Sequence, residues 1–133
     1  MRRAWLGVWM LALLLAGCGG QPAGEEPLRL EAEADAYTAV LEISPGIVGP
    51  NTFRATVTDQ DGQAVEAGEA VLHFAMPGMD HGTNQMALTP QAAGVWTGEG
   101  PHLMMTGQWE LRLEWISPQG ERHAFSYALE LKD

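Results

Sequence analysis

Apolar and polar residues alternate along several short segments of the chain, which is the pattern of a strand with one buried face. The clearest segment, 108–115, sets four apolar residues against four polar ones. Its apolar positions are Trp109, Leu111, Leu113 and Trp115. A period of two recurs over 37–43, 53–58 and 125–131, and no window offers three turns of apolar residues at helical spacing. The pattern predicts an all-β chain.

Turn signals separate these segments. They are Ser-Pro-Gly at 44–46, Asp-Gly at 61–62, Thr-Pro at 89–90 and Ser-Pro-Gln-Gly at 117–120. The spacing leaves room for about seven or eight short strands, each with one apolar face. Such strands bury their apolar faces by packing as two sheets, so we expect an immunoglobulin-like antiparallel β-sandwich over 28–133. Its core is expected to hold Trp96, Trp109 and Trp115.

The first 18 residues have the features of a bacterial export signal. Two arginines form a basic start, an apolar run covers 4–16, and small residues precede Cys18. The run is shorter than the roughly 20 apolar residues that a membrane span requires. Leu-Ala-Gly-Cys at 15–18 resembles the lipobox of bacterial lipoproteins, in which the Cys thiol receives a diacylglycerol. We therefore expect 1–17 to be removed and Cys18 to be lipidated.

The composition of the chain after the signal bears on a tether, on thiol chemistry and on the charge of possible partners. Residues 18–27 are rich in Gly, Pro and acidic groups, so we expect a tether between the lipid and the domain. Cys18 is the only cysteine, so lipidation leaves no thiol for a disulfide or a thiolate metal site. The net charge is −10, and it becomes −12 when Arg2 and Arg3 leave with the signal. Nucleic acid and anionic membrane surfaces are poor partners for such a chain.

Methionines are concentrated in one part of the chain. Outside the signal, all five fall within 76–105, at Met76, Met79, Met86, Met104 and Met105. Methionine used only as a core filler would be scattered through the strands. Met76-Pro-Gly-Met79 has Pro and Gly where a type II turn favours them, and such a turn brings its ends within about 7 Å. Two thioethers then converge, and His81 follows in a glycine-containing loop.

The second half of the cluster is His102-Leu-Met-Met105. In an extended strand His102 and Met104 share one face, whereas Met105 lies on the other face and is expected in the core. Antiparallel strand order places this segment and the 76–81 loop at the same end of the sandwich. His73 and the other remaining histidine, His123, are expected to be solvated surface groups outside the site.

Thioether sulfur with imidazole favours Cu(I) over hard ions, and imidazole also admits Cu(II). A thioether has no proton to lose and cannot form a disulfide in an oxidising compartment. We therefore expect copper as the cofactor, with Cu(I) favoured. The candidate metal ligands are Met76, Met79, His81, Met86, His102 and Met104.

The same segments carry a family resemblance. Residues 43–65 resemble the Pro-Gly…Gly-Pro-Asn…Asp-x-x-Gly-x-x-Val stretch of YtkA-like proteins and of the C-terminal envelope domain of CopD-like copper-transport proteins. Met-Pro-Gly-Met-x-His at 76–81 and Gly107-x-Trp109 resemble YtkA-like signatures, and the match covers most of 37–116. The resemblance implies an immunoglobulin-like sandwich in the bacterial envelope, associated with copper handling. His102-x-Met also resembles the His-x-Met pair of the PCuAC copper chaperones, although the rest of that spacing is absent.

Two functions remain open at this point. The first is a lipid-anchored envelope protein, facing the periplasm or the exterior, that stores copper or delivers it to a membrane copper transporter or an oxidase assembly protein. The second is a structural or protein-interaction domain whose methionines only pack a loop region. An enzyme is not expected, because the chain has no Gly-x-Ser-x-Gly, no phosphate-binding glycine loop with Lys and no His-x-x-x-His pair.

Overall fold

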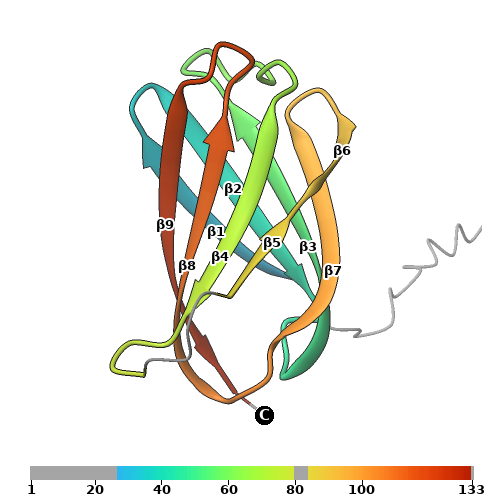
Figure 1. Ribbon diagram of the computed structural model, residues 1–133, viewed down its shortest axis with the longest axis vertical. Helices are drawn as coiled ribbons and strands as arrows, with labels where there is room; N and C mark the ends of the chain where they lie inside the picture. The colour runs from blue at the N-terminus through green and yellow to red at the C-terminus, as the bar shows by residue number, and fades with distance from the viewer. Residues whose placement is uncertain (1–26, 80–83, 133) are drawn as a thin grey trace, which may run out of the picture.

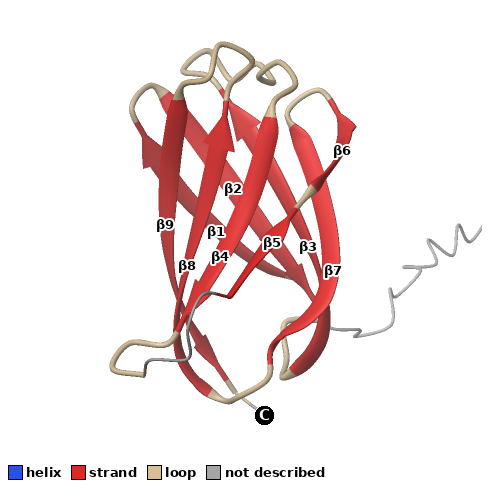
Figure 2. Ribbon diagram, in the orientation of Figure 1, coloured by secondary structure: helices blue, strands red, loops and turns tan. Residues whose placement is uncertain are grey.

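The structure is a computed structural model, and it describes residues 27–79 and 84–132. Within these residues all regular structure is strand, in nine segments that form two antiparallel sheets (Figures 1 and 2). The strands are β1 (Leu28–Ala34), β2 (Tyr37–Ser44), β3 (Gly49–Thr58), β4 (Glu69–Ala75), β5 (Asn84–Ala87), β6 (Thr89–Ala92), β7 (Val95–Leu103), β8 (Gly107–Ile116) and β9 (Arg122–Leu131). In this part of the chain, no helix has the length and hydropathy that a membrane crossing requires.

The two sheets are ordered β1-β2-β3-β7-β6 and β5-β4-β8-β9. Without β1, this is the ABED and C′CFG arrangement of an immunoglobulin-type sandwich, so the predicted fold class is confirmed. The described residues contain nine strands where seven or eight were expected. One reason is that the chain changes sheets at Leu88, which divides one extended segment into β5, paired with β4, and β6, paired with β7.

The alternating apolar positions form the core between the sheets, as predicted. Trp96, Trp109 and Trp115 are all buried, with exposed fractions of 1%, 7% and 3%. The indole Nε1 of Trp96 donates to the carbonyl of Gly68 at 3.1 Å. The hydroxyl of Tyr127 on β9 donates to the carbonyl of Ala39 on β2 at 2.9 Å, so a polar contact joins the two sheets inside the core.

The two ends of the sandwich differ in charge. We call the lower end in Figure 1 the methionine pole; its described loops are 45–48, 76–79 and 104–106, and none contains a charged residue. We call the upper end the acidic pole. Its loops are 35–36, 59–68, 93–94 and 117–121, and they contain Asp35, Asp59, Asp61, Glu66 and Glu121 but no Lys or Arg.

The expectation that His123 is a solvated surface group is wrong. Its exposed fraction is 8%, and its ring stacks on Trp115 with centroids 5.3 Å apart. Nδ1 lies 2.6 Å from Oδ2 of Asp35 in the turn between β1 and β2. The physical reason is strand parity, because residue 123 is two positions before Phe125 and therefore lies on the inward face of β9. His73 does lie on the outer face of its sheet, where Nε2 is 3.7 Å from Oε2 of Glu114.

A candidate soft-metal site at the methionine pole

A cavity of about 280 Å³ opens at the methionine pole. Residues from the 76–79 loop, the end of β7, the 104–106 loop and the start of β8 line it. They include Met76, Met79, His102, Met104, Met105 and Trp109. The two methionine segments, about 25 residues apart in sequence, therefore meet in one place. This confirms the prediction that both lie at the same end of the sandwich.

The 76–79 loop is the predicted turn. The amide of Met79 donates to the carbonyl of Met76 at 3.1 Å, and Gly78 has φ +78°. A positive φ at the third residue is the requirement of a type II turn, and glycine meets it without strain. Pro77 and Gly78 therefore hold the two thioether-bearing residues at opposite ends of one turn.

The 104–106 loop is held from its inner side by Trp109. The buried indole donates from Nε1 to the carbonyl of Met105 at 2.9 Å, which places this loop over the ring. Met76 also approaches the start of β8, since a Cβ at Gly107 would lie only 3.1 Å from Cε of Met76. Gly107 has φ +127° and no side chain, so its backbone leaves room for the methionine. In Gly107-x-Trp109, the tryptophan thus lines the cavity and the glycine makes room for Met76 beside it.

His102 lies at the inner side of the cavity. Its ring stacks on Phe74, with centroids 4.8 Å apart and planes 14° apart. Nδ1 is buried and has no hydrogen-bond partner among the described residues. A Cβ at Gly100 would lie 2.6 Å from Nδ1 but 3.8 Å from Nε2, so the Cε1–Nδ1 edge faces Gly100. Nε2 is the ring nitrogen directed away from that backbone.

Three of the cavity methionines are open to solvent. The exposed fractions are 44% for Met79, 59% for Met104 and 45% for Met105.

The described lining contains no carboxylate, and no group of three His, Cys, Asp or Glu side chains elsewhere in 27–79 and 84–132 could hold a metal. The donors are therefore four thioethers and one imidazole, a soft set that fits Cu(I) and does not suit hard ions such as Mg²⁺ or Ca²⁺.

The structure brings together Met76, Met79, His102 and Met104 from the predicted ligand set. His81 lies outside the described residues. The expectation that Met105 belongs to the core is wrong: β7 ends at Leu103, so strand alternation no longer applies to residue 105, which turns out to the cavity rim. The sequence signal that could have placed Met105 at the site is its position directly after Met104.

Met86 is the predicted ligand that the structure separates from the others, and this corrects the prediction. It does not line the cavity but is half-buried against the core. Its Sδ would be 3.0 Å from a Cβ at Gly98, so the side chain fills the space above that glycine on β7. In β5 the inward parity of Met86 directs it to this gap between the sheets rather than to the pole. Met86 is a packing residue.

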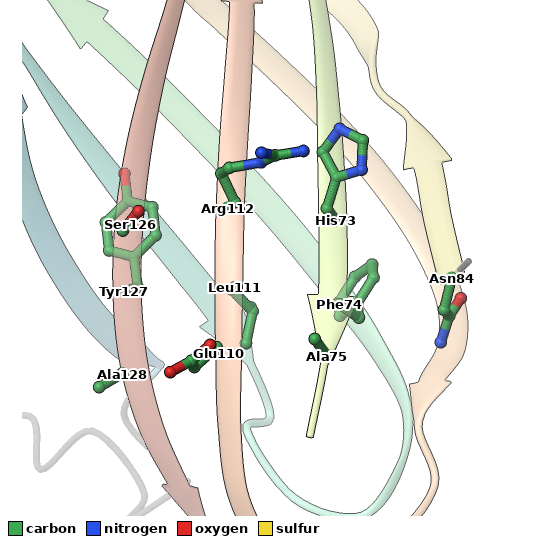
Figure 3. A pocket seen from close by; sticks show the side chains of 10 residues that line it. All are labelled: His73, Phe74, Ala75, Asn84, Glu110, Leu111, Arg112, Ser126, Tyr127 and Ala128. Carbon is green, nitrogen blue, oxygen red and sulfur yellow. The ribbon is translucent and has the colours of Figure 1, made fainter. Parts of the chain in front are cut away.

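A larger hollow of about 620 Å³ lies on the outer face of the β5-β4-β8-β9 sheet (Figure 3). There Arg112 on β8 extends toward His73 on the neighbouring strand β4, with which it is paired in register. Ala75 and Ala128 flank Glu110 and leave the surface shallow because their side chains are short. This face has no converging set of donors, so its larger volume does not make it the better site.

The sequence also matches a known protein family. The sequence profile of the YtkA-like family matches residues 31–114, well over half of the chain, and the protein belongs to that family. The match runs from within β1 to within β8 and includes every described residue that lines the methionine cavity. No curated protein matches the sequence.

Proposed function

We propose that this member of the YtkA-like family binds Cu(I) in the cavity at the methionine pole. The observation that carries the proposal is the meeting of four thioethers from two loops, beside the imidazole of His102, in a cavity without carboxylates. Thioether and imidazole donors select Cu(I), and unlike thiols neither forms a disulfide, so both can bind the ion in an oxidising compartment. His102 Nε2, Met76 and Met79, with Met104 or Met105, are the groups that would hold the ion.

The position of the site suits storage or delivery. Met79, Met104 and Met105 lie at the rim, so an ion held there can be reached by a competing ligand without unfolding the sandwich. The proposal includes the lipid on Cys18, which would keep the domain at a membrane of the bacterial envelope. A membrane copper transporter or an oxidase assembly protein is then the proposed recipient, and the proposal involves no catalytic step.

The alternative is a protein-interaction domain without a metal. Exposed methionines form adaptable contact surfaces in other proteins, and three of them project here. The two functions differ in whether the rim methionines contribute as sulfur donors or only as apolar surface. Leucine preserves the volume and apolar character of methionine but has no sulfur, so Met→Leu variants separate them.

The deciding experiment is a Cu(I) competition titration against a chromogenic chelator. We expect the parent protein to take copper from the chelator and the double variant Met79→Leu, Met104→Leu to bind at least about tenfold more weakly, a difference of roughly 1.4 kcal/mol. Met86→Leu is the matched control, because it removes a sulfur outside the cavity and should bind as the parent does. Failure of the parent to bind would overturn the copper proposal, whereas equal binding by the double variant would overturn the assignment of its site.

A further inference from the structure

All large hydrophobic side chains that are exposed in the described part of the chain lie at the methionine pole. They are Ile47, Met79, Met104 and Met105, with exposed fractions between 42% and 59%. Ile47 comes from the turn between β2 and β3 and does not line the methionine cavity. Copper binding therefore does not account for its exposure. Clustered exposed apolar residues typically mark a surface for a protein partner or a membrane.

The chain that leads to Cys18 leaves the domain at the same pole. The first strand begins at Leu28, which is paired with Ile43 at the end of β2, beside the 45–48 turn. That turn in turn lies next to Leu103, since Gly49 and Leu103 are paired at the end of β7. The segment 18–27 is thus attached next to the exposed hydrophobic side chains.

The length of that segment limits how the domain can sit on a membrane. Ten residues span at most about 35 Å when fully extended. A ten-residue strand such as β8, which runs from one pole to the other, is itself about 33 Å long. The acidic pole could reach the bilayer only if the whole segment were drawn out along the domain. The methionine pole can reach it without any such extension, because the segment is attached at that pole.

Charge favours the same orientation. The acidic pole contains five carboxylates and no basic residue in its loops, whereas the described loops of the methionine pole contain no charge and the chain after β9 adds the basic Lys132 there. A lipid surface repels or desolvates the carboxylates of the acidic pole, whereas it accepts the uncharged loops of the methionine pole. We propose that the methionine pole, through Ile47, Met79, Met104 and Met105, docks on the surface of the bilayer that holds the Cys18 lipid. Because the tether keeps the pole at high effective concentration, a small apolar contact is sufficient.

This inference rests on the lipid anchor included in the proposed function, and it adds that the copper cavity faces the lipid. It concerns a neutral contact and so agrees with the expectation that an acidic chain avoids anionic membranes. Docking should be strongest on zwitterionic lipid and weaker when anionic lipid is added. An increase with anionic lipid would contradict an apolar contact.

The test uses the full lipoprotein, free of copper, in phosphatidylcholine vesicles. The lipid occupies Cys18, so an introduced cysteine provides the single free thiol for a fluorophore. Thr106→Cys labels the methionine pole and Gln119→Cys the acidic pole, both at exposed loop positions. With nitroxide-labelled headgroups in the vesicles, we expect quenching at 106 to be at least about threefold that at 119. Equal quenching at both positions would overturn the proposal.

Two charge variants sharpen the result. Ile47→Glu should lower quenching at 106 to the level at 119 while leaving the copper titration unchanged, because Ile47 does not line the cavity. Gln60→Glu adds the same charge to an exposed loop position at the acidic pole and should change neither measurement. Quenching at 106 that appears in native membranes but not in lipid vesicles would replace lipid docking by contact with a membrane protein.

The outcomes also separate this inference from the proposed function. Failure of the copper titration with quenching intact would remove the copper site and keep the docking surface. An intact mass without the lipid on Cys18 would overturn the anchor and this inference together, and would leave the copper site standing.

Discussion

The indole Nε1 of Trp109 donates to the backbone carbonyl of Met105, so a buried core residue fixes the position of an exposed loop. This bond explains why Gly-x-Trp belongs with the methionine segments although neither residue supplies a metal ligand. The glycine leaves room for Met76, and the tryptophan holds the loop that carries Met104 and Met105. The cavity wall is therefore encoded in the core of the sandwich.

Replacement of this indole should affect both stability and copper binding. Trp109→Phe removes the bond to Met105, and we expect the free energy of unfolding to fall by about 1–3 kcal/mol from the lost bond and the smaller ring. Copper should bind more weakly because the 104–106 loop loses its support. The control is Trp96→Phe, which removes the indole bond to Gly68 far from the cavity. It should lower stability similarly and leave the copper affinity unchanged, as measured by urea unfolding and chelator competition.

His102 can be displaced without being mutated. A Cβ at Gly100 would lie 2.5 Å from Cε1 of the imidazole, so Gly100→Ala must push the ring out of its stack on Phe74. If Nε2 is a copper ligand, the affinity for Cu(I) should fall by about tenfold or more. The control is Gly98→Ala two residues earlier, where a Cβ would press on Leu88 and Met86 with similar crowding. Equal copper affinities in the two variants would exclude His102 from the site.

The strands were predictable because their signal is local and redundant. In β8 every second residue from Trp109 to Trp115 is apolar, and all four of these residues are buried. Two of the misassigned positions lie where strand parity alone does not decide the surroundings of a side chain. Met105 follows the end of a strand, and Met86 has inward parity but lies in a short edge strand just before the chain changes sheets. For His123, the expected strand began at residue 125, whereas β9 begins at Arg122, so strand parity directs residue 123 inward.

The site was predictable in outline for a different reason. A Met-Pro-Gly-Met turn is determined by four neighbouring residues, so the convergence of Met76 and Met79 follows from sequence. Its meeting with the 104–106 loop follows from antiparallel strand order. The role of Gly107 and the burial of His102 Nδ1 depend on contacts between distant segments, and no local pattern contains them.

Asn51 should be necessary for the shape of the β2–β3 turn at the methionine pole. Its side chain is 3% exposed, accepts a bond from the amide of Gly46 at 2.7 Å and donates to the carbonyls of Ile47 and Gly49. Asn51→Ala leaves these three backbone groups without their partner, and we expect a loss of about 2–4 kcal/mol in the free energy of unfolding. Asn51→Asp is the informative comparison, since it keeps the acceptor and loses both donors. Urea unfolding that shows no loss for either variant would contradict this role.

Tyr127 should make the stability of the protein fall at alkaline pH. Burial, and secondarily the carboxylate of Glu31, raises the pKa of its hydroxyl well above the ordinary value of about 10. The unfolded chain releases this proton above about pH 10, whereas the folded chain retains it, so the contribution to stability is complete below that pH and is lost as the pH rises.

The measurement is urea unfolding at about pH 8 and about pH 11, on either side of the ordinary tyrosine pKa. Tyr127→Phe removes the bond to Ala39 and should be less stable by about 1 kcal/mol at the lower pH. It should then lose less stability than the parent on going to the higher pH, because one titrating group is gone. Trp96→Phe removes a core hydrogen bond without a titratable group, so its curve should run parallel to that of the parent. Parallel curves for all three proteins would show that the Tyr127 hydroxyl titrates alike in the folded and unfolded states.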